Sequence, residues 1–271
     1  MAGIGTAVAR RLPDCGFGAI LAYGSRGAMK IIAVYNVKGG VGKSTLAANL
    51  AWASATRSAR GTLLWDLDPQ GSGGYLLGID RRKGRDAASI FNRDTDPAAL
   101  VVPTPWPGLD VLPADPSLRG IDRLLANLGK KRRLAKLIST LAERYDRVIL
   151  DCPPVLNELS SQVIRAADTI IVPLTASPLA RQSLQDVLEE LRRNHPGHGA
   201  VLPVFAMYDA RRKLHADARA AEPTWPIVPM ASVVEKMAIH RQPVGAFAPK
   251  APATEAVFQL WAGIEAKLAG K

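Results

Sequence analysis

Cysteine is scarce in this 271-residue sequence, which contains only Cys15 and Cys152. Two cysteines cannot build a disulfide framework, and these two lack the CxxC spacing typical of metal sites. A reducing, cytoplasmic compartment is therefore expected. Long hydrophobic runs are missing too, because no apolar stretch approaches the roughly 20 residues that a membrane-spanning helix needs. The composition argues against a disulfide-stapled secreted domain and against a transmembrane protein.

Acidic residues are few beside basic ones: 24 Asp and Glu stand against 35 Lys and Arg, which gives a formal charge of +11. A chain this basic favours a polyanionic partner, either nucleic acid or an anionic membrane surface. Charge alone does not separate these two, and a solvated basic surface without a partner stays open as well. Hydrophobic residues make up 48% of the sequence, enough for one large domain with a packed core.

The most informative stretch runs from Ile31 to Trp52. An apolar, β-branched run predicts a buried strand, glycines at 39, 40 and 42 follow, and strong helix formers come next. Strand, glycine loop and helix form an arrangement that cradles phosphates, because glycine lets backbone N–H groups approach an anion at a helix N-terminus. Lys43 would reach the β- and γ-phosphates of a nucleotide, and the Ser44 hydroxyl would bind Mg²⁺.

The loop departs from the general phosphate-loop pattern at one position. Val37 stands where that pattern begins with glycine, and Lys38 follows it. The resulting Lys-Gly-Gly-Val-Gly-Lys-Ser-Thr motif resembles the deviant Walker A motif of the ParA/MinD family of ATPases. The resemblance covers about residues 29–270 and implies that the chain hydrolyses ATP with Mg²⁺. It assigns nucleotide binding to the whole motif, namely Lys38, Gly39, Gly40, Val41, Gly42, Lys43, Ser44 and Thr45.

Two acidic motifs accompany the loop. Asp66 and Asp68 point the same way at the end of a strand predicted over 61–66, and the Asp-x-Asp-Pro-Gln segment resembles the family's second acidic motif. Asp151 ends an apolar strand predicted over Val148–Leu150, which is the Walker B arrangement that holds Mg²⁺ through water. By this resemblance Asp66 lies near the Mg²⁺ shell and Asp68 holds the attacking water.

The resemblance thus implies a full set of site residues. Catalysis would depend on Lys38, Lys43 and Asp68, and the metal on Ser44, Asp66 and Asp151. Gln70 would belong to the nucleotide site, and Met207 and Tyr208 would be neighbours of the base.

Strands and helices alternate along the chain. Besides the strand at Ile31, strands are predicted over 61–66, 109–112, 148–150, 168–174 with Pro173 ending it, 201–208 and 227–229. Helices are predicted over 46–52, 118–141 with a break at Gly129, 178–193 and 253–268. Because the strands are continuously apolar, we expect a single-domain α/β P-loop NTPase with a twisted, mostly parallel sheet and helices on both faces. That domain would span 29–271, and residues 1–28 would be an over-extended translation start, in preference to a flexible arm.

The resemblance favours a ParA-type ATPase that segregates or positions cargo over nucleoid DNA in the cytoplasm. It implies a homodimer that closes on two ATP molecules, with Lys38 of each subunit reaching the phosphates of its neighbour. It also implies binding to double-stranded DNA without sequence preference, and a ParB-like or other adaptor protein that stimulates hydrolysis. The cargo, whether plasmid, chromosome origin or protein cluster, is not encoded in any motif.

The resemblance points to a DNA-facing surface in the second half of the chain. Its basic candidates are Arg192, Arg193, Arg211, Arg212, Lys213, Arg219, Arg241 and Lys250. The span from Arg119 to Arg147, with nine Lys and Arg against three Asp and Glu, is a competing footprint. Raw charge favours this basic span, and the resemblance favours the candidates in the second half.

Two other functions stay open at this point. A MinD-like, membrane-associated regulator of division needs a lysine-rich amphipathic helix near the C-terminus. The tail from Glu255 carries no net charge, so attachment to an anionic membrane is disfavoured. A metal-carrier relative needs cysteine pairs that bridge subunits, and the two cysteines lack that spacing.

Overall fold

The computed structural model describes residues 28–80, 86–92, 95–129 and 131–270. Residues 1–28 were expected to be an over-extended translation start or a flexible arm. All of them except residue 28 lie outside the described residues. Lys130 of the basic span lies outside them too.

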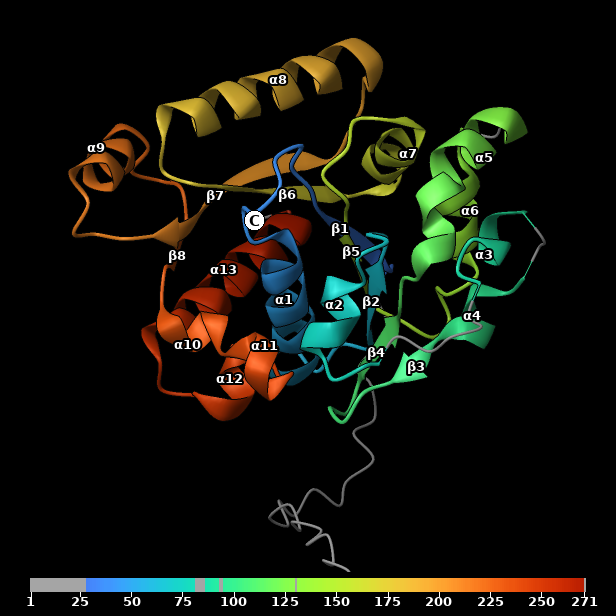
Figure 1. The fold of residues 1–271 in the computed structure, drawn as a ribbon, viewed down its shortest axis with the longest axis horizontal. Coiled ribbons are helices and arrows are strands. Elements are labelled where there is room, and N and C mark those ends of the chain that lie inside the picture. Colours follow the sequence, from blue (N-terminus) through green and yellow to red (C-terminus); the bar gives the residue numbers. More distant parts are fainter. Residues whose placement is uncertain (1–27, 81–85, 93–94, 130, 271) are drawn as a thin grey trace, which may run out of the picture.

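An eight-stranded sheet forms the centre of the molecule, in the order β3-β4-β2-β5-β1-β6-β7-β8 (Figure 1). Neighbouring strands run parallel except for the antiparallel pair β3 and β4, which confirms the predicted mostly parallel sheet. The strands are β1 (Lys30–Val34), β2 (Thr62–Asp66), β3 (Val102–Pro103), β4 (Leu109–Leu112), β5 (Arg147–Asp151), β6 (Thr169–Leu174), β7 (Ala200–Tyr208) and β8 (Ile227–Pro229).

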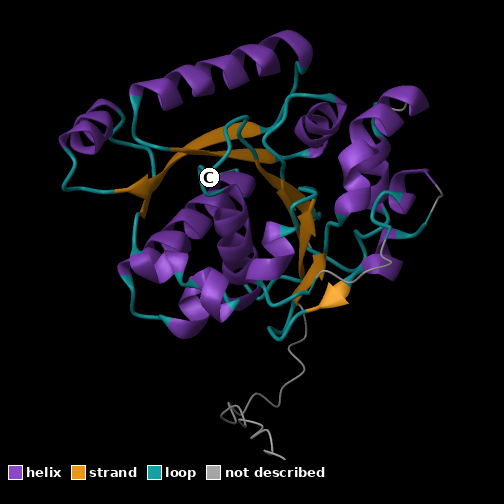
Figure 2. Ribbon diagram, viewed as in Figure 1, coloured by secondary structure: helices purple, strands orange, loops and turns teal. Residues whose placement is uncertain are grey.

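Helices cover both faces of the sheet (Figure 2). One face carries α5 to α8, and the other carries α1, α2 and α10 to α13. The helices are α1 (Lys43–Arg57), α2 (Ser72–Leu76), α3 (Ser89–Asn92), α4 (Pro97–Leu100), the 3₁₀ turn η1 (Pro116–Gly120), α5 (Ile121–Leu128), α6 (Arg133–Ser139), α7 (Glu158–Ala166), α8 (Pro178–Asn194), α9 (Lys213–Ala221), α10 (Ser232–Glu235), α11 (Met237–His240), α12 (Val244–Phe247) and α13 (Pro252–Leu268). Within the described residues, no helix combines the length and apolar character that a membrane crossing requires.

Alternate residues of the central strands pack into two separate cores. In β5, Val148 and Leu150 join the core beneath α5 to α8. Ile149, between them, joins the core beneath α1 and α13, where Trp261 and Ile264 are also buried. Because both faces of the sheet are covered, these strands read as continuous apolar runs in the sequence.

The segment expected as one interrupted helix over 118–141 is built differently. A 3₁₀ turn begins it at Pro116, α5 follows, and α6 ends at Ser139. Gly129 breaks the segment as predicted: it follows α5 with a left-handed φ of 60°, a conformation that glycine adopts without strain. The sequence pattern located the break but not the tighter first turn.

Pro173 does not end its strand as expected, because β6 continues to Leu174. The proline carbonyl lies just past the end of β1, where it accepts a hydrogen bond from the Asn36 side-chain amide at 2.7 Å. The Asn36 amide donates this bond and needs only a carbonyl acceptor from residue 173, not an N–H group. The missing N–H of proline therefore costs the sheet nothing at this point.

Arg147, at the start of β5, forms a two-bond ion pair with Glu265 of α13. The two distances are 2.7 Å from Nε to Oε1 and 2.9 Å from Nη2 to Oε2. The Arg147 side chain is only 8% exposed. This arginine belongs to the basic span that the sequence offered as a DNA footprint, yet it ties α13 to the centre of the sheet.

We expect Glu265→Ala to lower the free energy of unfolding by about 3 kcal/mol, because Arg147 would stay buried without its charged partner. The matched control is Glu189→Ala, which removes the exposed ion pair with Arg193 and should cost under about 0.5 kcal/mol. Urea unfolding followed by circular dichroism measures both. Equal losses would contradict the importance of the Arg147 pair.

Candidate functional site

A glycine loop joins β1 to α1 at the carboxyl edge of the sheet. Gly40 and Gly42 have φ values of 71° and 85°, which L-residues with a side chain adopt only with strain. Gly42 is the residue before α1, and no side chain caps this helix. The N–H groups of the first turn are therefore left to bind a ligand in front of the loop. Val41 points inward and is buried.

A cavity of about 740 Å³ opens in front of this loop. Most of the predicted phosphate-loop residues line it, together with two residues of the Asp-x-Asp-Pro-Gln segment and the start of α2. The predicted site residues that line the cavity are Gly39, Gly40, Gly42, Lys43, Ser44, Thr45, Asp68 and Gln70. Ser72, Tyr75, Pro154 and Ala238 also line it and were not predicted.

The two lysines of the motif have different surroundings. Lys43 is buried, and its Nζ donates a hydrogen bond to the Lys38 carbonyl at 2.7 Å. Burial lowers the pKa of Lys43, while the Asp151 carboxylate opposes this shift. Lys38 is half-buried, and its Nζ donates to the Leu179 carbonyl in the first turn of α8. Lys38 is not one of the described residues that line the cavity.

Two buried carboxylates lie side by side behind the loop. Asp66 and Asp151 are register partners in the parallel pair β2 and β5, and both are fully buried. Asp66 accepts hydrogen bonds from the N–H groups of Asp68 and Gly74, each at 3.1 Å. Neither oxygen of Asp151 has a hydrogen-bond partner of ordinary geometry. A methyl group on Gly73 would come within 2.8 Å of an Asp151 oxygen, so glycine is required beside this pair.

Burial raises the pKa of both acids. Desolvation raises the pKa of Asp66 to about 7, although backbone N–H groups oppose the shift. Desolvation, and then the charge of Asp66, raise the pKa of Asp151 well above its ordinary value, while the nearby Ser44 hydroxyl lowers it. The pair places hard oxygen donors next to a helix N-terminus: Asp66 already accepts two backbone hydrogen bonds, whereas the oxygens of Asp151 lack such partners.

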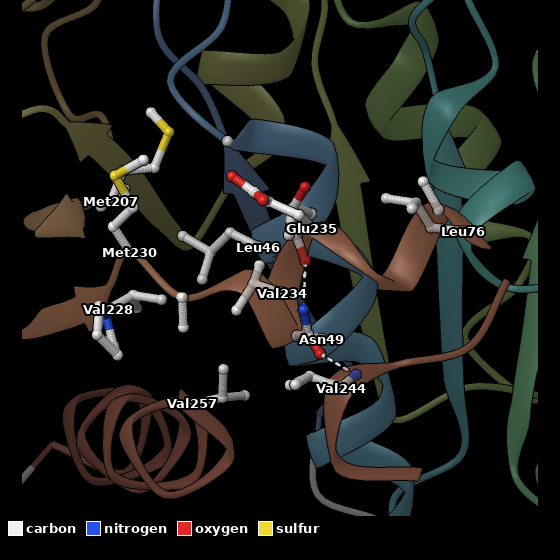
Figure 3. A pocket seen from close by; sticks show the side chains of 16 residues that line it. Leu46, Asn49, Leu76, Met207, Val228, Met230, Val234, Glu235, Val244 and Val257 are labelled. Carbon is white, nitrogen blue, oxygen red and sulfur yellow. Dashed lines mark hydrogen bonds between the residues drawn. The ribbon is translucent and has the colours of Figure 1, made fainter. Parts of the chain in front are cut away.

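A second, apolar cavity of about 200 Å³ adjoins the first (Figure 3). The two share Gly42, Thr45, Leu76 and Ala238. Figure 3 shows Met207 and Met230 on one side and Leu76 on the other. At its floor, Asn49 donates to the Thr45 carbonyl at 2.8 Å and accepts the Val244 N–H at 2.9 Å. An apolar slot beside a phosphate loop suits a flat aromatic base.

Of the two predicted base neighbours, Met207 lines this cavity and Tyr208 does not. The Tyr208 ring packs against Phe205 and His215, with centroid distances of 6.4 and 5.6 Å. Sequence reasoning missed the remaining walls, namely Leu46, Asn49, Leu76, Ala206, Val228, Pro229, Met230, Ala231, Val234, Glu235, Ala238, Val244 and Val257. The signal in the sequence was limited to the strands predicted over 201–208 and 227–229, because strands of a parallel sheet have their carboxyl ends at one edge.

The eight proposed DNA contacts do not form one patch. Arg192 and Arg193 lie in the last turn of α8. A groove lined by residues of both α8 and α9 shows that α9 lies beside the first turns of α8, at the opposite end of that helix. Arg211, Arg212, Lys213 and Arg219 belong to α9 and the loop before it. Arg241 and Lys250 lie among α11 to α13 on the other face of the sheet.

Several of these cations are already paired. Arg211 binds both oxygens of Asp209, at 2.9 and 3.0 Å. Arg241 pairs with Asp80 at 2.7 Å, and Arg219 donates to the Trp225 carbonyl at 2.6 Å. In the competing basic span, Arg133 is buried against the Ile90 carbonyl, and Arg144 pairs with Asp110.

Comparison with known proteins gives one consistent result. A family model described as an AAA domain matches residues 29–196. The chromosome partitioning protein ParA of Myxococcus xanthus is 41% identical over 192 residues, which cover 68% of this chain and 67% of that protein.

Solved structures agree in fold. Cobyrinic acid a,c-diamide synthase from Mycobacterium smegmatis, with a bound ATP analogue and magnesium, is 28% identical with a TM-score of 0.74, over 90% of this chain and 97% of that one. McdA from Cyanothece, in complex with ATP, has a TM-score of 0.76 at 23% identity, over 87% of this chain and 96% of that one. The cavity, its phosphate loop and these relatives lead to one conclusion: the chain belongs to the ParA/MinD family of ATPases, which bind ATP with Mg²⁺.

Proposed function

We propose that this ATPase closes as an ATP-bound homodimer, binds DNA without sequence preference, and segregates or positions cargo on the nucleoid. The observation that carries the dimer is the position of Lys38. Its charged end is bonded to α8 and does not line the cavity of its own subunit, although the motif places it next to the phosphate loop. A cation at the rim of one site can serve a second copy that docks against this face.

Lys43 and the loop amides would hold the phosphates. The Lys43 Nζ bonds to the Lys38 carbonyl, so phosphate binding would exchange this internal hydrogen bond for a charge-assisted bond to phosphate oxygens. Lys38 of the partner would then meet the same phosphates and stabilise charge that develops during hydrolysis. Catalysis would appear only in the closed dimer.

Mg²⁺ fits the residues behind the loop. The donors are the carboxylates of Asp66 and Asp151 and the hydroxyl of Ser44, which are the hard oxygen ligands that Mg²⁺ prefers. The unpartnered, buried oxygens of Asp151 support this assignment, because an isolated buried carboxylate is costly without a cation or a proton. When bound, Mg²⁺ would neutralise the charge of the β- and γ-phosphates.

Asp68 would position the attacking water. It lines the cavity, is half-exposed, and is held by the Gln70 N–H, which donates to Oδ1 at 2.9 Å. Gln70 would border the phosphates from the same turn. The base would occupy the apolar cavity of Figure 3 against Met207. Tyr208 would be a neighbour of the base only through the chain, because its ring packs against Phe205 and His215.

The DNA-binding surface is best assigned to α9. Arg212 and Lys213 are exposed at its N-terminus, where no acidic residue lies in the first turn and backbone N–H groups also favour phosphate. Arg192, Arg193, Arg241 and Lys250 are separated from α9 and are secondary candidates. The basic span is weakened as a footprint because Arg133 and Arg147 are used inside the fold.

The membrane alternative has little support in the packing of α13. Val257, Leu260, Trp261 and Ile264 are each at most 4% exposed, and they form part of the core beneath α1. The apolar face that a membrane-binding helix would insert is therefore already used. A ParB-like or other adaptor that stimulates hydrolysis remains part of the proposal.

A methyl group tests the metal assignment. Gly73→Ala should weaken Mg²⁺-dependent ATP binding by roughly tenfold or more, because its Cβ would crowd Asp151 and Asp66 at 2.8 and 3.1 Å. Gly74→Ala is the matched control, since its Cβ would meet nothing closer than 3.6 Å. Titrating a fluorescent ATP analogue with Mg²⁺ and with EDTA measures the effect. If both variants bind the ATP analogue with equal affinity in Mg²⁺, Asp66 and Asp151 do not hold the metal.

The role of Lys38 is tested by separating binding from closure. Lys38→Ala should retain ATP binding to the monomer but lose ATP-dependent dimerisation, with turnover reduced roughly 100-fold or more. Lys43→Ala should lose nucleotide binding itself. Sizing chromatography with ATP and a phosphate-release assay report on the two steps. A full dimer with normal turnover in Lys38→Ala would rule out action across the interface.

DNA binding is tested with a salt series on random duplex DNA, in ATP and in ADP. Affinity should require ATP and fall with salt at a slope of about −0.9 per phosphate neutralised. Arg212→Ala/Lys213→Ala should reduce the magnitude of this slope by about two per subunit, or about four in the homodimer, and weaken all sequences alike. Lys131→Ala/Arg132→Ala provides the comparison in the basic span. If only this second pair matters, the α9 assignment is wrong.

A further inference from the structure

Asn36 is a fully buried side chain that lies between β1 and the phosphate loop. Its amide makes three hydrogen bonds. Nδ2 donates to the Pro173 carbonyl at 2.7 Å, and Oδ1 accepts the Lys38 N–H at 3.0 Å and the Ser183 hydroxyl at 3.2 Å. The partners settle the orientation of the amide, because a carbonyl only accepts and a backbone N–H only donates.

These bonds connect Lys38 to two other elements. Pro173 belongs to β6, so Nδ2 anchors the amide to the sheet. Ser183 belongs to α8, one turn after Leu179, whose carbonyl accepts the Nζ of Lys38. The backbone of Lys38 is therefore held by a buried network, whereas its charged end has a single bond at the surface.

The Lys38 backbone is therefore fixed, whereas its side chain can move. The buried bond through Asn36 sets where the Lys38 backbone lies and in which direction its side chain leaves the loop. The side chain itself can exchange partners by giving up the exposed Leu179 carbonyl, for which water can substitute. A lysine that must reach a neighbouring subunit needs this combination of a fixed base and a free end.

We propose that Asn36 is a positioning residue for Lys38, and that it acts on the closure and turnover of the dimer through that lysine alone. This inference rests on the proposed action of Lys38 across the dimer. Asparagine suits the place because it offers a donor to Pro173 and an acceptor to Lys38 at the same time. Aspartate would set a carboxylate oxygen against the Pro173 carbonyl, and alanine would leave all three partners unpaired.

A double-mutant cycle tests the inference. Asn36→Ala should lower kcat for ATP hydrolysis by roughly 10- to 100-fold, since a misplacement near 1 Å has effects of this size, while the affinity of the monomer for a fluorescent ATP analogue stays within about threefold. Asn36→Ala/Lys38→Ala should be no slower than Lys38→Ala alone, because nothing remains to be positioned. Asn36→Asp, which keeps the acceptor for Lys38, should fall between wild type and Asn36→Ala.

The control is Gln162→Ala, which removes another buried amide, one that accepts the Leu134 N–H at 3.0 Å in the layer of α6 and α7. Its stability loss should resemble that of Asn36→Ala, and its effect on kcat should multiply with that of Lys38→Ala. If Lys38→Ala is defective and the losses in kcat from Asn36→Ala and Lys38→Ala multiply in the double variant, the positioning role is wrong but the proposed function stands. A Lys38→Ala variant with normal turnover would overturn both.

Discussion

The parallel register of three strands determines where the chemistry of this protein can occur. Val34 pairs with Asp151, and Asp151 pairs with Asp66, so β1, β5 and β2 end level with one another. The glycine loop leaves β1 at the point where the two carboxylates end their strands. Burying two acids side by side is costly, as their raised pKa values indicate. The sheet tolerates this because two apolar cores hold the strands from both faces.

Local signals in the sequence predicted most of the residues around the phosphate loop. The glycines, Lys43 and the acids follow strand ends within short segments, so strand prediction and spacing placed them at one edge of the sheet. The Lys38 Nζ instead bonds to α8 and does not line the cavity. The base cavity could not be predicted in this way, since its walls come from α1, β7, β8 and the helices after Pro229, and its apolar residues resemble any core residue. Tyr208 illustrates the limit. Met207 has a left-handed φ of 53°, and the register between β7 and β8 is irregular from Phe205 to Tyr208. Simple strand alternation therefore does not give the side-chain directions here, and Met207 lines the cavity while Tyr208 does not.

Charge was the least predictable property. A count of Lys and Arg treats all cations alike, but the fold uses Arg133 and Arg147 internally and pairs Arg211 with Asp209. Only tertiary structure separates such residues from those that face solvent, because their partners lie up to 118 residues away, as for Arg147 and Glu265. The same holds for Asn36, whose partners Pro173 and Ser183 are 137 and 147 residues distant.

The packing of α13 against α1 has a consequence for protein synthesis. The helix that follows the phosphate loop is covered by residues more than 190 positions later: Asn49 holds the Val244 N–H, and Trp261 donates to the Ser58 hydroxyl. A nascent chain emerging from the ribosome therefore exposes the apolar side of α1 until translation has passed α13. The phosphate loop is encoded early, but the walls of the base cavity include Val228, Val244 and Val257, so the nucleotide site is completed only by residues much later in the chain.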